Sequence, residues 1–209
     1  MLWYDCRDDP NTSDAVKDAI TALKEHGMYD ESLIFLTSDH GYPDPSKKIT
    51  PEFGWVSEES KDDKPKDIEY NPVHIDKDEK RSIAGTYNDI RIINFYVVNG
   101  QAVDSDKYTH KLKWLRMSEK YIKEQLIKYP KLIVLGDFNI VPRESDAYEY
   151  SPDSILCSVG ERDALQSIFN LGLKDSYIPN DEETPYTWWD YRVGAFHRDI
   201  GYRIDLVLA

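Results

Sequence analysis

The chain has 209 residues, which is enough for one large domain or two small ones with a substantial hydrophobic core. Hydrophobic residues make up 40% of it and aromatic residues 12%, a balance that excludes a largely disordered protein. The 39 acidic and 26 basic residues give a formal net charge of −13, which repels nucleic acid unless a local basic face or a bound cation opposes it.

The first fifty residues predict one helix followed by one strand. Ser13 is a suitable N-cap, apolar residues then recur every three or four positions, and Gly27 ends the pattern. Residues 32–37 form a short apolar run typical of a buried parallel strand. A charged, proline-spaced segment follows, so we expect a domain boundary near Phe53, with a helix-strand fragment over 1–53 and a second domain over 54–209.

Strands and helices alternate after the charged segment, which itself holds one predicted edge strand at 67–70. Residues 82–87 and 90–98 are β-rich runs joined by Asn88-Asp89, a pair that favours a tight antiparallel hairpin. The further predicted elements are a helix over 107–129, a strand at 132–135, a helix over 161–171, and strands at 187–191 and 203–208. This order predicts an α/β fold.

Asp137 and Asn139 follow directly after the buried strand predicted at 132–135. Ligands of α/β proteins bind beyond the carboxyl ends of strands, so both side chains are candidates for chemistry. Asp137 can orient or deprotonate a water molecule, and Asn139 can donate a hydrogen bond to a phosphoryl oxygen. The alternative interpretation is a turn that the two side chains cap.

A second cluster favours the functional interpretation. Trp188 and Trp189 stand next to Asp190 and Arg192, and Arg203-Ile204-Asp205 follows shortly after. Core packing would explain one tryptophan, but it does not explain two tryptophans beside a carboxylate and a guanidinium.

Four motifs in this order resemble those of the exonuclease III group of the endonuclease/exonuclease/phosphatase superfamily. They are Tyr96-Val97-Val98-Asn99-Gly100, Gly136-Asp137-Phe138-Asn139, Thr187-Trp188-Trp189-Asp190-Tyr191-Arg192 and Arg203-Ile204-Asp205. The resemblance covers about residues 54–209. It implies a four-layer α/β sandwich of two mixed sheets flanked by helices, here lacking its first and last strands. It also implies hydrolysis of DNA phosphodiesters, at abasic sites and from 3′ ends, that depends on Mg²⁺ or Mn²⁺.

The resemblance assigns roles residue by residue, catalytic for Tyr96, Asp137, Asn139 and Asp205 and substrate-binding for Asn99. Asp137 resembles the carboxylate that activates the attacking water, and Asn139 resembles the donor that stabilises the pentavalent phosphorus. Tyr96 and Asn99 resemble residues on the phosphate side and the metal side of the pocket. Asp205 resembles the acid that orients a catalytic histidine.

The same resemblance places the substrate pocket at the tryptophan motif. Trp188 resembles the wall of a pocket for an abasic sugar, and Asp190 and Arg192 match positions beside it. The family's glutamate metal ligand has no counterpart in residues 1–53, and no Asp-His pair follows Asp205. We therefore expect weaker Mg²⁺ binding and slower turnover than in the family.

The front of the chain resembles a different group, the sulfatase branch of the alkaline phosphatase superfamily. The matching segment ends in Thr37-Ser38-Asp39-His40-Gly41, and the resemblance implies that Asp39 and His40 are metal ligands. Two ligands are too few to hold a hard cation tightly, and Cys6 lacks the pattern of that group's nucleophile. A polar strand end exposed to water is the alternative.

Three functional interpretations follow. The favoured one is a DNA-repair phosphodiesterase of exonuclease III type. The others are a sulfatase-like metal-dependent ester hydrolase and a non-catalytic composite gene product joined near residue 53. We expect a cytoplasmic monomer. We do not expect it to insert into membranes, because the longest apolar run, 132–136, is far shorter than a membrane span.

Overall fold

The computed structural model describes residues 65–177, 185–190 and 194–209. The chain divides into two units, Met1–Lys64 and Pro65–Ala209, and all of the described residues belong to the second. The helix and strand predicted in residues 1–53, and the Asp39–His40 pair, therefore lie outside the described residues. The expected boundary near Phe53 stays a prediction.

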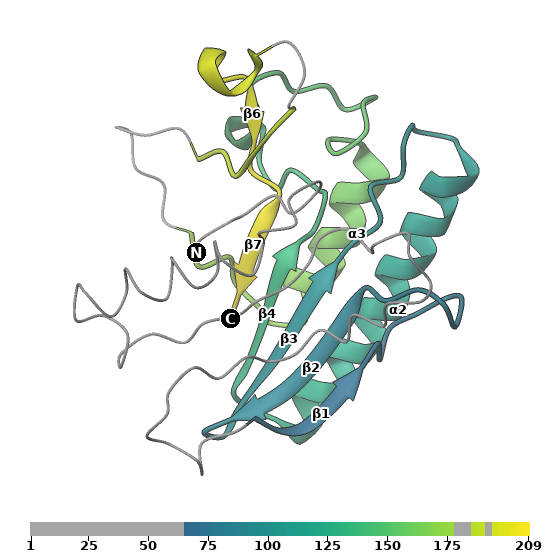
Figure 1. Ribbon diagram of the computed structural model, residues 1–209, viewed down its shortest axis with the longest axis vertical. Coiled ribbons are helices and arrows are strands. Elements are labelled where there is room, and N and C mark those ends of the chain that lie inside the picture. Colours follow the sequence, from purple (N-terminus) through teal and green to yellow (C-terminus); the bar gives the residue numbers. More distant parts are fainter. Residues whose placement is uncertain (1–64, 178–184, 191–193) are drawn as a thin grey trace, which may run out of the picture. The chain divides into compact units, whose positions relative to one another are not determined.

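A five-stranded sheet forms the centre of the described unit (Figure 1). β3 and β4 run parallel, and the other neighbours in the sheet are antiparallel, so the sheet is mixed. In spatial order the strands are β1 (Lys66–Tyr70), β2 (Ser82–Tyr87), β3 (Ile90–Tyr96), β4 (Leu132–Asp137) and β7 (Asp205–Leu208). The edge strand predicted at 67–70 is β1, at one edge of the sheet.

The hairpin of β2 and β3 confirms the prediction made from Asn88 and Asp89. Tyr87 pairs with Ile90 across the turn, and the two turn residues have φ angles of 44° and 68°. A two-residue hairpin turn of this kind needs left-handed backbone at both positions, which Asn and Asp tolerate better than most residues. Local sequence therefore sets the register of this strand pair.

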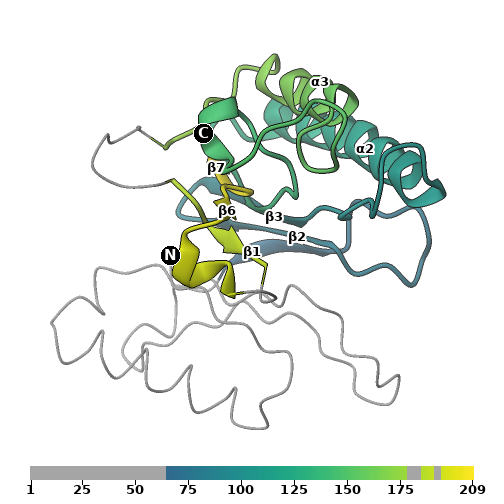
Figure 2. The ribbon, with the colours of Figure 1, turned by 90° about the horizontal axis from the view of Figure 1, so that it is seen from above.

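Two helices, α2 (Asp106–Lys128) and α3 (Val159–Phe169), cover one face of the sheet (Figure 2). The Ser105 side chain caps α2 by accepting from the main-chain N–H of Tyr108 at 3.1 Å. Ser158 and Glu161 form a reciprocal capping box at the start of α3. Both helices lie within two residues of their predicted bounds. Among the described residues, no helix is long and apolar enough to cross a membrane.

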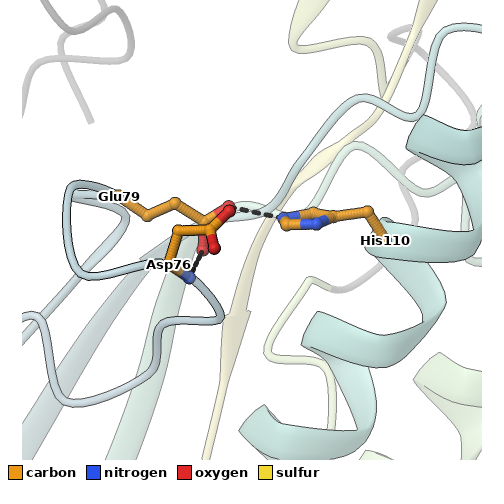
Figure 3. Close-up of side chains that lie close together, drawn as sticks. All are labelled: Asp76, Glu79 and His110. Atoms are coloured by element: carbon orange, nitrogen blue, oxygen red, sulfur yellow. Dashed lines mark hydrogen bonds and ion pairs between the residues drawn. The ribbon is translucent and has the colours of Figure 1, made fainter.

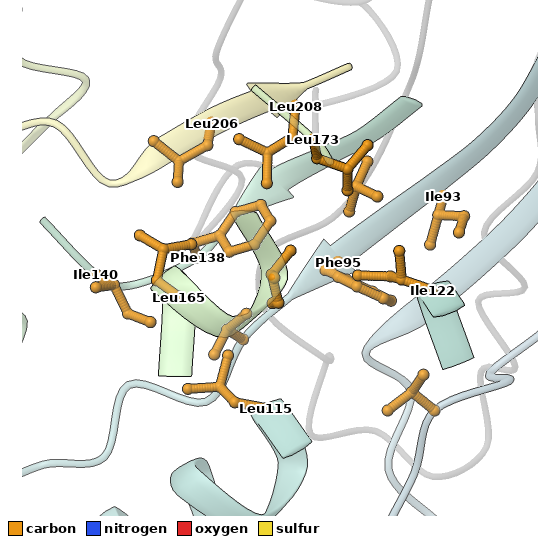
Figure 4. Close-up of a cluster of buried hydrophobic side chains, with 14 of the residues drawn as sticks. Ile93, Phe95, Leu115, Ile122, Phe138, Ile140, Leu165, Leu173, Leu206 and Leu208 are labelled. Atoms are coloured by element: carbon orange, nitrogen blue, oxygen red, sulfur yellow. The ribbon is translucent and has the colours of Figure 1, made fainter. Parts of the chain in front are cut away.

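The main hydrophobic core lies between this face of the sheet and the two helices (Figure 4). The ring of Phe95, on β3, stands edge-on to Trp114 of α2 at 5.2 Å between ring centres and to Phe138 at 6.4 Å. Other buried members of the core are Ile93, Leu115, Ile122, Val134, Ile140, Leu165, Ile168, Leu206 and Leu208. Alternate residues of the strands supply this core, so the residues between them project from the opposite face.

A two-stranded sheet of β5 (Trp188–Trp189) and β6 (Gly201–Tyr202) stands apart from the large sheet. The strand predicted at 203–208 begins only at Asp205, as β7, and β6 ends before it at Tyr202. The reason is that Arg203 and Ile204 donate their main-chain N–H groups to other partners, the Asp146 carbonyl and the Thr187 hydroxyl. Because of these bonds, Arg203 and Ile204 do not pair with a neighbouring strand as β-sheet residues do.

Candidate active site

Three of the predicted site residues stand in one row across the sheet. Tyr96 ends β3 and pairs with Asp137 at the end of β4, and Asp137 pairs with Asp205 at the start of β7. Directly paired residues project from the same face. The preceding row contains Phe95 and Leu206, which belong to the core beneath the helices. Tyr96, Asp137 and Asp205 therefore project from the face opposite α2 and α3, at the edge where β3 and β4 end.

Gly136 allows β4 to lie close to β3 just before Asp137. Its φ is +125°, and a Cβ built there would lie 2.1 Å from the carbonyl oxygen of Phe95. Backbone cannot move aside as the end of a flexible side chain can, so only glycine fits between the two strands at this point. The backbone of Phe95 therefore explains why the Gly-Asp-Phe-Asn motif begins with glycine.

Asn139 holds the carboxylate of Asp137 from two sides. Its main-chain N–H donates to Oδ1 at 2.7 Å, and its side-chain Nδ2 donates to Oδ2 at 3.0 Å. The φ of Asn139 is 49°, a left-handed conformation that asparagine adopts more readily than most residues. Both carboxylate oxygens are thereby oriented by one neighbouring residue.

The amide of Asn139 also connects the segments that follow β3 and β4. Its Nδ2 donates to the Val97 carbonyl at 2.9 Å, and its Oδ1 accepts from Nδ2 of Asn99 at 3.0 Å. Asn139 is only 5% exposed, and both of its amide hydrogens are used in these bonds. Donation to a phosphoryl oxygen, as the resemblance implies, stays a prediction and would require one of these bonds to open.

Thr187 connects the tryptophan segment to Asp205. Its Oγ1 accepts from the main-chain N–H groups of Ile204 and Asp205, both at 3.1 Å. Trp188 follows it, half-buried, with its ring centre 6.1 Å from that of Tyr202. The structure therefore brings the Trp188 and Asp205 segments together, through a threonine to which sequence analysis gave no role.

Arg203 anchors the chain just before Asp205. Its Nη2 donates to Asp146 at 2.8 Å and to Asp175 at 2.6 Å, and its main-chain N–H donates to the Asp146 carbonyl. Burial lowers the pKa of Arg203, but the hydrogen bonds and charges of the two carboxylates outweigh burial and raise it. Arg203 is therefore a charged structural anchor that is 2% exposed.

A buried lysine lies behind the site. Lys111, on α2, is 0% exposed and donates from Nζ to the main-chain carbonyls of Asn139 at 2.7 Å and Asn99 at 3.1 Å. It also forms an ion pair with Glu161 of α3. Sequence analysis missed Lys111 because lysine is common on the polar side of a helix, yet its position was visible. It lies three residues after Tyr108 and four before Leu115, in the same buried stripe of α2.

Of the remaining predicted site residues, the structure describes Asp190 alone. Asp190 is half-buried directly after β5. Arg192 lies in the stretch 191–193, outside the described residues, as do Asp39 and His40. The neighbouring Trp189 donates from Nε1 to Asp199 at 3.2 Å.

The paired Asp137 and Asp205 offer only oxygen ligands on one face of the sheet. Oxygen donors from one or two carboxylates, completed by substrate phosphate, are the usual protein ligands of Mg²⁺. The donor set therefore fits a hard divalent cation such as Mg²⁺ or Mn²⁺.

A different set of possible ligands is formed by Asp76, Glu79 and His110, whose ligand atoms lie within 4.8 Å of one another (Figure 3). Glu79 is already engaged, because one oxygen bonds to His110 and the other accepts from the Ile75 N–H at 2.9 Å. These bonds connect the loop between β1 and β2 to α2. An imidazole with two carboxylates suits a transition metal better than Mg²⁺.

The sequence of the chain was compared with protein families and with individual proteins. A model of the endonuclease/exonuclease/phosphatase family matches residues 49–209. An exodeoxyribonuclease of Bacillus subtilis (strain 168) is 30% identical over 133 residues, which are 61% of this chain and 51% of that protein. Exodeoxyribonuclease III of Haemophilus influenzae is 27% identical over 57% of this chain and 49% of its own length. The chain thus spans about half the length of these two relatives.

Solved structures agree with the sequence relatives. The 3′ phosphatase NExo from Neisseria, bound to a product DNA hairpin, has a TM-score of 0.65 at 38% identity and covers 70% of this chain and 58% of its own. An AP endonuclease from Archaeoglobus fulgidus has a TM-score of 0.61 at 34% identity, with the same coverage. The predicted α/β fold, a mixed sheet flanked by helices, is confirmed. Because the family match spans more than half of its length, the chain belongs to the endonuclease/exonuclease/phosphatase family.

Proposed function

We propose that the protein is a DNA-repair phosphodiesterase of exonuclease III type, acting at abasic sites and as a 3′–5′ exodeoxyribonuclease. The observation that carries the proposal is the row of Tyr96, Asp137 and Asp205 at the edge of the sheet where β3 and β4 end, with Asn139 clamping the Asp137 carboxylate. The relatives named exodeoxyribonuclease and AP endonuclease support the same reaction class.

Asp137 is the residue best placed to act on the attacking water. Its carboxylate is fixed by the two donors of Asn139, so its orientation is set before substrate arrives. A fixed carboxylate can align a water molecule for in-line attack on phosphorus and accept its proton. Asp205 lies in the neighbouring register position, where a second carboxylate can orient a proton donor or help hold a cation.

Tyr96 and Arg81 form the side of the row that suits a phosphate. The Arg81 guanidinium lies 4.8 Å from the centre of the Tyr96 ring, and the Arg81 Nη1 atom is buried with no hydrogen-bond partner among the described residues. A guanidinium is a favourable partner for a phosphoryl oxygen, and the other donors of Arg81 would make that contact because Nη1 is buried. This local positive charge opposes the repulsion that a net charge of −13 exerts on DNA.

Mg²⁺ or Mn²⁺ is the cofactor that the oxygen ligands of Asp137 and Asp205 suit. Such an ion would supply Lewis-acid stabilisation of the charge that develops on the phosphoryl oxygens. The residues of the chain do the remaining work: Asp137 orients the water, Asn139 holds Asp137, and Arg81 contacts the phosphate.

Trp188, Asp190 and Arg192 are proposed to surround the sugar of the cleaved nucleotide. The half-buried ring of Trp188 packs with Tyr202 close to the segment that begins β7. An aromatic wall of this kind suits a flipped-out abasic sugar, which offers no base for hydrogen bonding. DNA with abasic sites or 3′ ends is therefore the proposed substrate, and a cytoplasmic, monomeric protein remains our prediction.

The experiment measures cleavage of a duplex containing one abasic site, with Mg²⁺, Mn²⁺ or EDTA, and turnover of an aryl sulfate in parallel. We expect the duplex to be cut only with the cation. Aryl sulfate turnover that is lost in Asp39→Ala/His40→Ala would instead favour the sulfatase-like hydrolase. No turnover of either substrate at high protein concentration would favour the non-catalytic product and overturn the proposal.

A further inference from the structure

Each hydrogen of the Lys111 ammonium donates to an acceptor within the protein. The ammonium donates to the carbonyl oxygens of Asn99 and Asn139 and to a carboxylate oxygen of Glu161, so each of its three hydrogens has a partner. The side chains of Lys111 and Glu161 are both 0% exposed. The group therefore occupies one fixed position, with no solvent to share its bonds.

The two carbonyls belong to the segments that leave β3 and β4. Asn99 and Asn139 are forty residues apart in sequence, and their side chains also bond to each other at 3.0 Å. Between Asn99 and α2 the chain passes Gly100, whose φ is +90° and whose added Cβ would lie 3.1 Å from Cδ of Lys111. Glycine thus lets this segment pass close to the side chain of Lys111, while the carbonyl of Asn99 accepts from the ammonium.

Glu161 connects the same ammonium to the start of α3. Its carboxylate accepts from the main-chain N–H of Ser158 at 3.1 Å and of Leu156 at 3.3 Å. Ser158 in turn shares a 2.8 Å hydrogen bond with the hydroxyl of Tyr108 on α2. Two helices and two candidate active-site segments therefore meet at one buried charge.

The energetics of this pair do not favour a purely stabilising role. Burial lowers the pKa of Lys111, while the charges of Glu161 and Asp137 act in the opposite direction. A buried ion pair often contributes no more to stability than a well-packed apolar pair of the same volume. The bonds to two specific carbonyls, by contrast, fix geometry that an apolar pair cannot fix.

We propose that Lys111 is a positioning residue for the active site, with Glu161 as its counterion. Lys111 holds the main chain of Asn99 and Asn139, and Asn139 then holds the Asp137 carboxylate in its reactive orientation. The catalytic part of this inference rests on the proposed function, whereas the positioning part does not.

The test compares wild type with the double variant Lys111→Met/Glu161→Gln. Methionine keeps the apolar stem without the charge, and glutamine can keep the capping box of α3, so the pair is removed without leaving a buried charge. Lys120→Met is the matched control, because the side chain of Lys120 is 80% exposed on the same helix. Three quantities are measured: the thermal midpoint, the NMR resonances of the Asn139 side-chain amide, and the kcat and KM for abasic DNA.

We expect the double variant to stay folded with a lower thermal midpoint, because the carbonyls of Asn99 and Asn139 lose their donor, and to show shifted and broadened Asn139 amide resonances. Its kcat should fall on the order of 100-fold with KM little changed, because a small displacement of a catalytic group has this effect. Lys120→Met should match wild type in all three quantities. Unchanged Asn139 resonances and unchanged kcat in the folded double variant would overturn the inference.

Two further readouts keep the test decisive. If wild type does not cleave DNA, the proposed function fails, but the amide resonances still decide the positioning role. If the double variant does not fold, ¹⁵N labelling of the lysines in wild type takes its place. Slowly exchanging Lys111 ammonium hydrogens coupled to the Asn139 carbonyl would support the inference, and a rapidly exchanging, uncoupled ammonium would overturn it.

Discussion

Asn139 donates both its main-chain N–H and its side-chain amide to the carboxylate of Asp137, at 2.7 and 3.0 Å. A contact between the side chain of Asp137 and a main-chain N–H two residues later is a local one, as in an Asx turn, and Asn139 itself has a left-handed φ of 49°. The Gly-Asp-Phe-Asn motif is therefore a local unit in which the asparagine fixes the aspartate. Its connection to the other segments is made by Asn99, Val97 and Lys111.

Asn139→Gly should lower kcat while the protein stays folded. Glycine adopts the left-handed backbone without strain and keeps the main-chain N–H, but it loses the amide that holds Oδ2 of Asp137. Loss of one oriented donor in an active site lowers kcat on the order of 100-fold to 1000-fold. Asn139→Ala should show the same loss and a stability lower by a further 1 kcal/mol or so, because alanine is strained at this φ. Steady-state cleavage kinetics and urea unfolding measure the two effects, and wild-type kcat in Asn139→Gly would contradict the assignment.

Glu161→Gln should be destabilising on its own and much less so with Lys111→Met. The single change leaves a buried ammonium without its counterion, which costs about 3–5 kcal/mol. The double change removes that charge as well. Urea unfolding of both variants measures the difference, and equal loss of stability in the two would show that the charge is not the cause.

Thr187→Val should destabilise the segment that begins β7. Valine keeps the shape of threonine but leaves the N–H groups of Ile204 and Asp205 without their acceptor. Each unsatisfied buried donor costs about 1–3 kcal/mol. Thr187→Ser keeps the oxygen and should retain most of the stability and of the cleavage rate. Urea unfolding with the cleavage assay provides the check, and equal behaviour of the valine and serine variants would argue against this role for the hydroxyl.

Acid should weaken the contact between Glu79 and His110. Burial raises the pKa of Glu79, but the Ile75 N–H and the hydrogen bond and charge of His110 outweigh burial, so the pKa lies below its ordinary value of 4.5. A carboxyl with a lowered pKa adds stability that is complete above its unfolded pKa and is lost as pH falls through the folded value.

The matched variant for this prediction is Glu79→Gln, which cannot ionise. Its unfolding free energy should be lower than that of wild type at neutral pH, and the gap should close below about pH 4.5. Glu124→Gln is the control, because Glu124 lies half exposed on the outside of α2. Urea unfolding across this range measures the gap. A gap that stays constant with pH would contradict the assignment of the lowered pKa to Glu79.

Local signals predicted most of the described fold. The Asn88–Asp89 turn set the hairpin, and the apolar stripe within 107–129 set α2. Asp137 and Asn139 were recognisable because they follow a buried strand, and a residue in that place lies at the binding edge of an α/β sheet. The contact between Asn139 and Asp137 joins residues only two apart, so it could be predicted from the local sequence.

The long-range parts of the site were not predictable in the same way. Thr187 acts through main-chain groups seventeen and eighteen residues away, and nothing in the periodicity near it indicates that contact. Glu161 is the fourth residue of a Ser-x-x-Glu capping box that begins at Ser158, yet the helix was predicted to start at Glu161 itself. Lys111 interrupts a buried stripe, and that interruption was the one signal pointing to its role.

The central claim is that Asp137 acts directly on a scissile phosphodiester. Single-turnover cleavage of an abasic duplex by Asp137→Asn, beside Asp163→Asn on the exposed surface of α3, tests it most directly. The asparagine variant should fold as wild type does and lose cleavage by a factor on the order of 1000 or more, because it cannot accept the proton of the attacking water. Asp163→Asn should cleave at the wild-type rate. Cleavage by Asp137→Asn at that same rate would contradict the account.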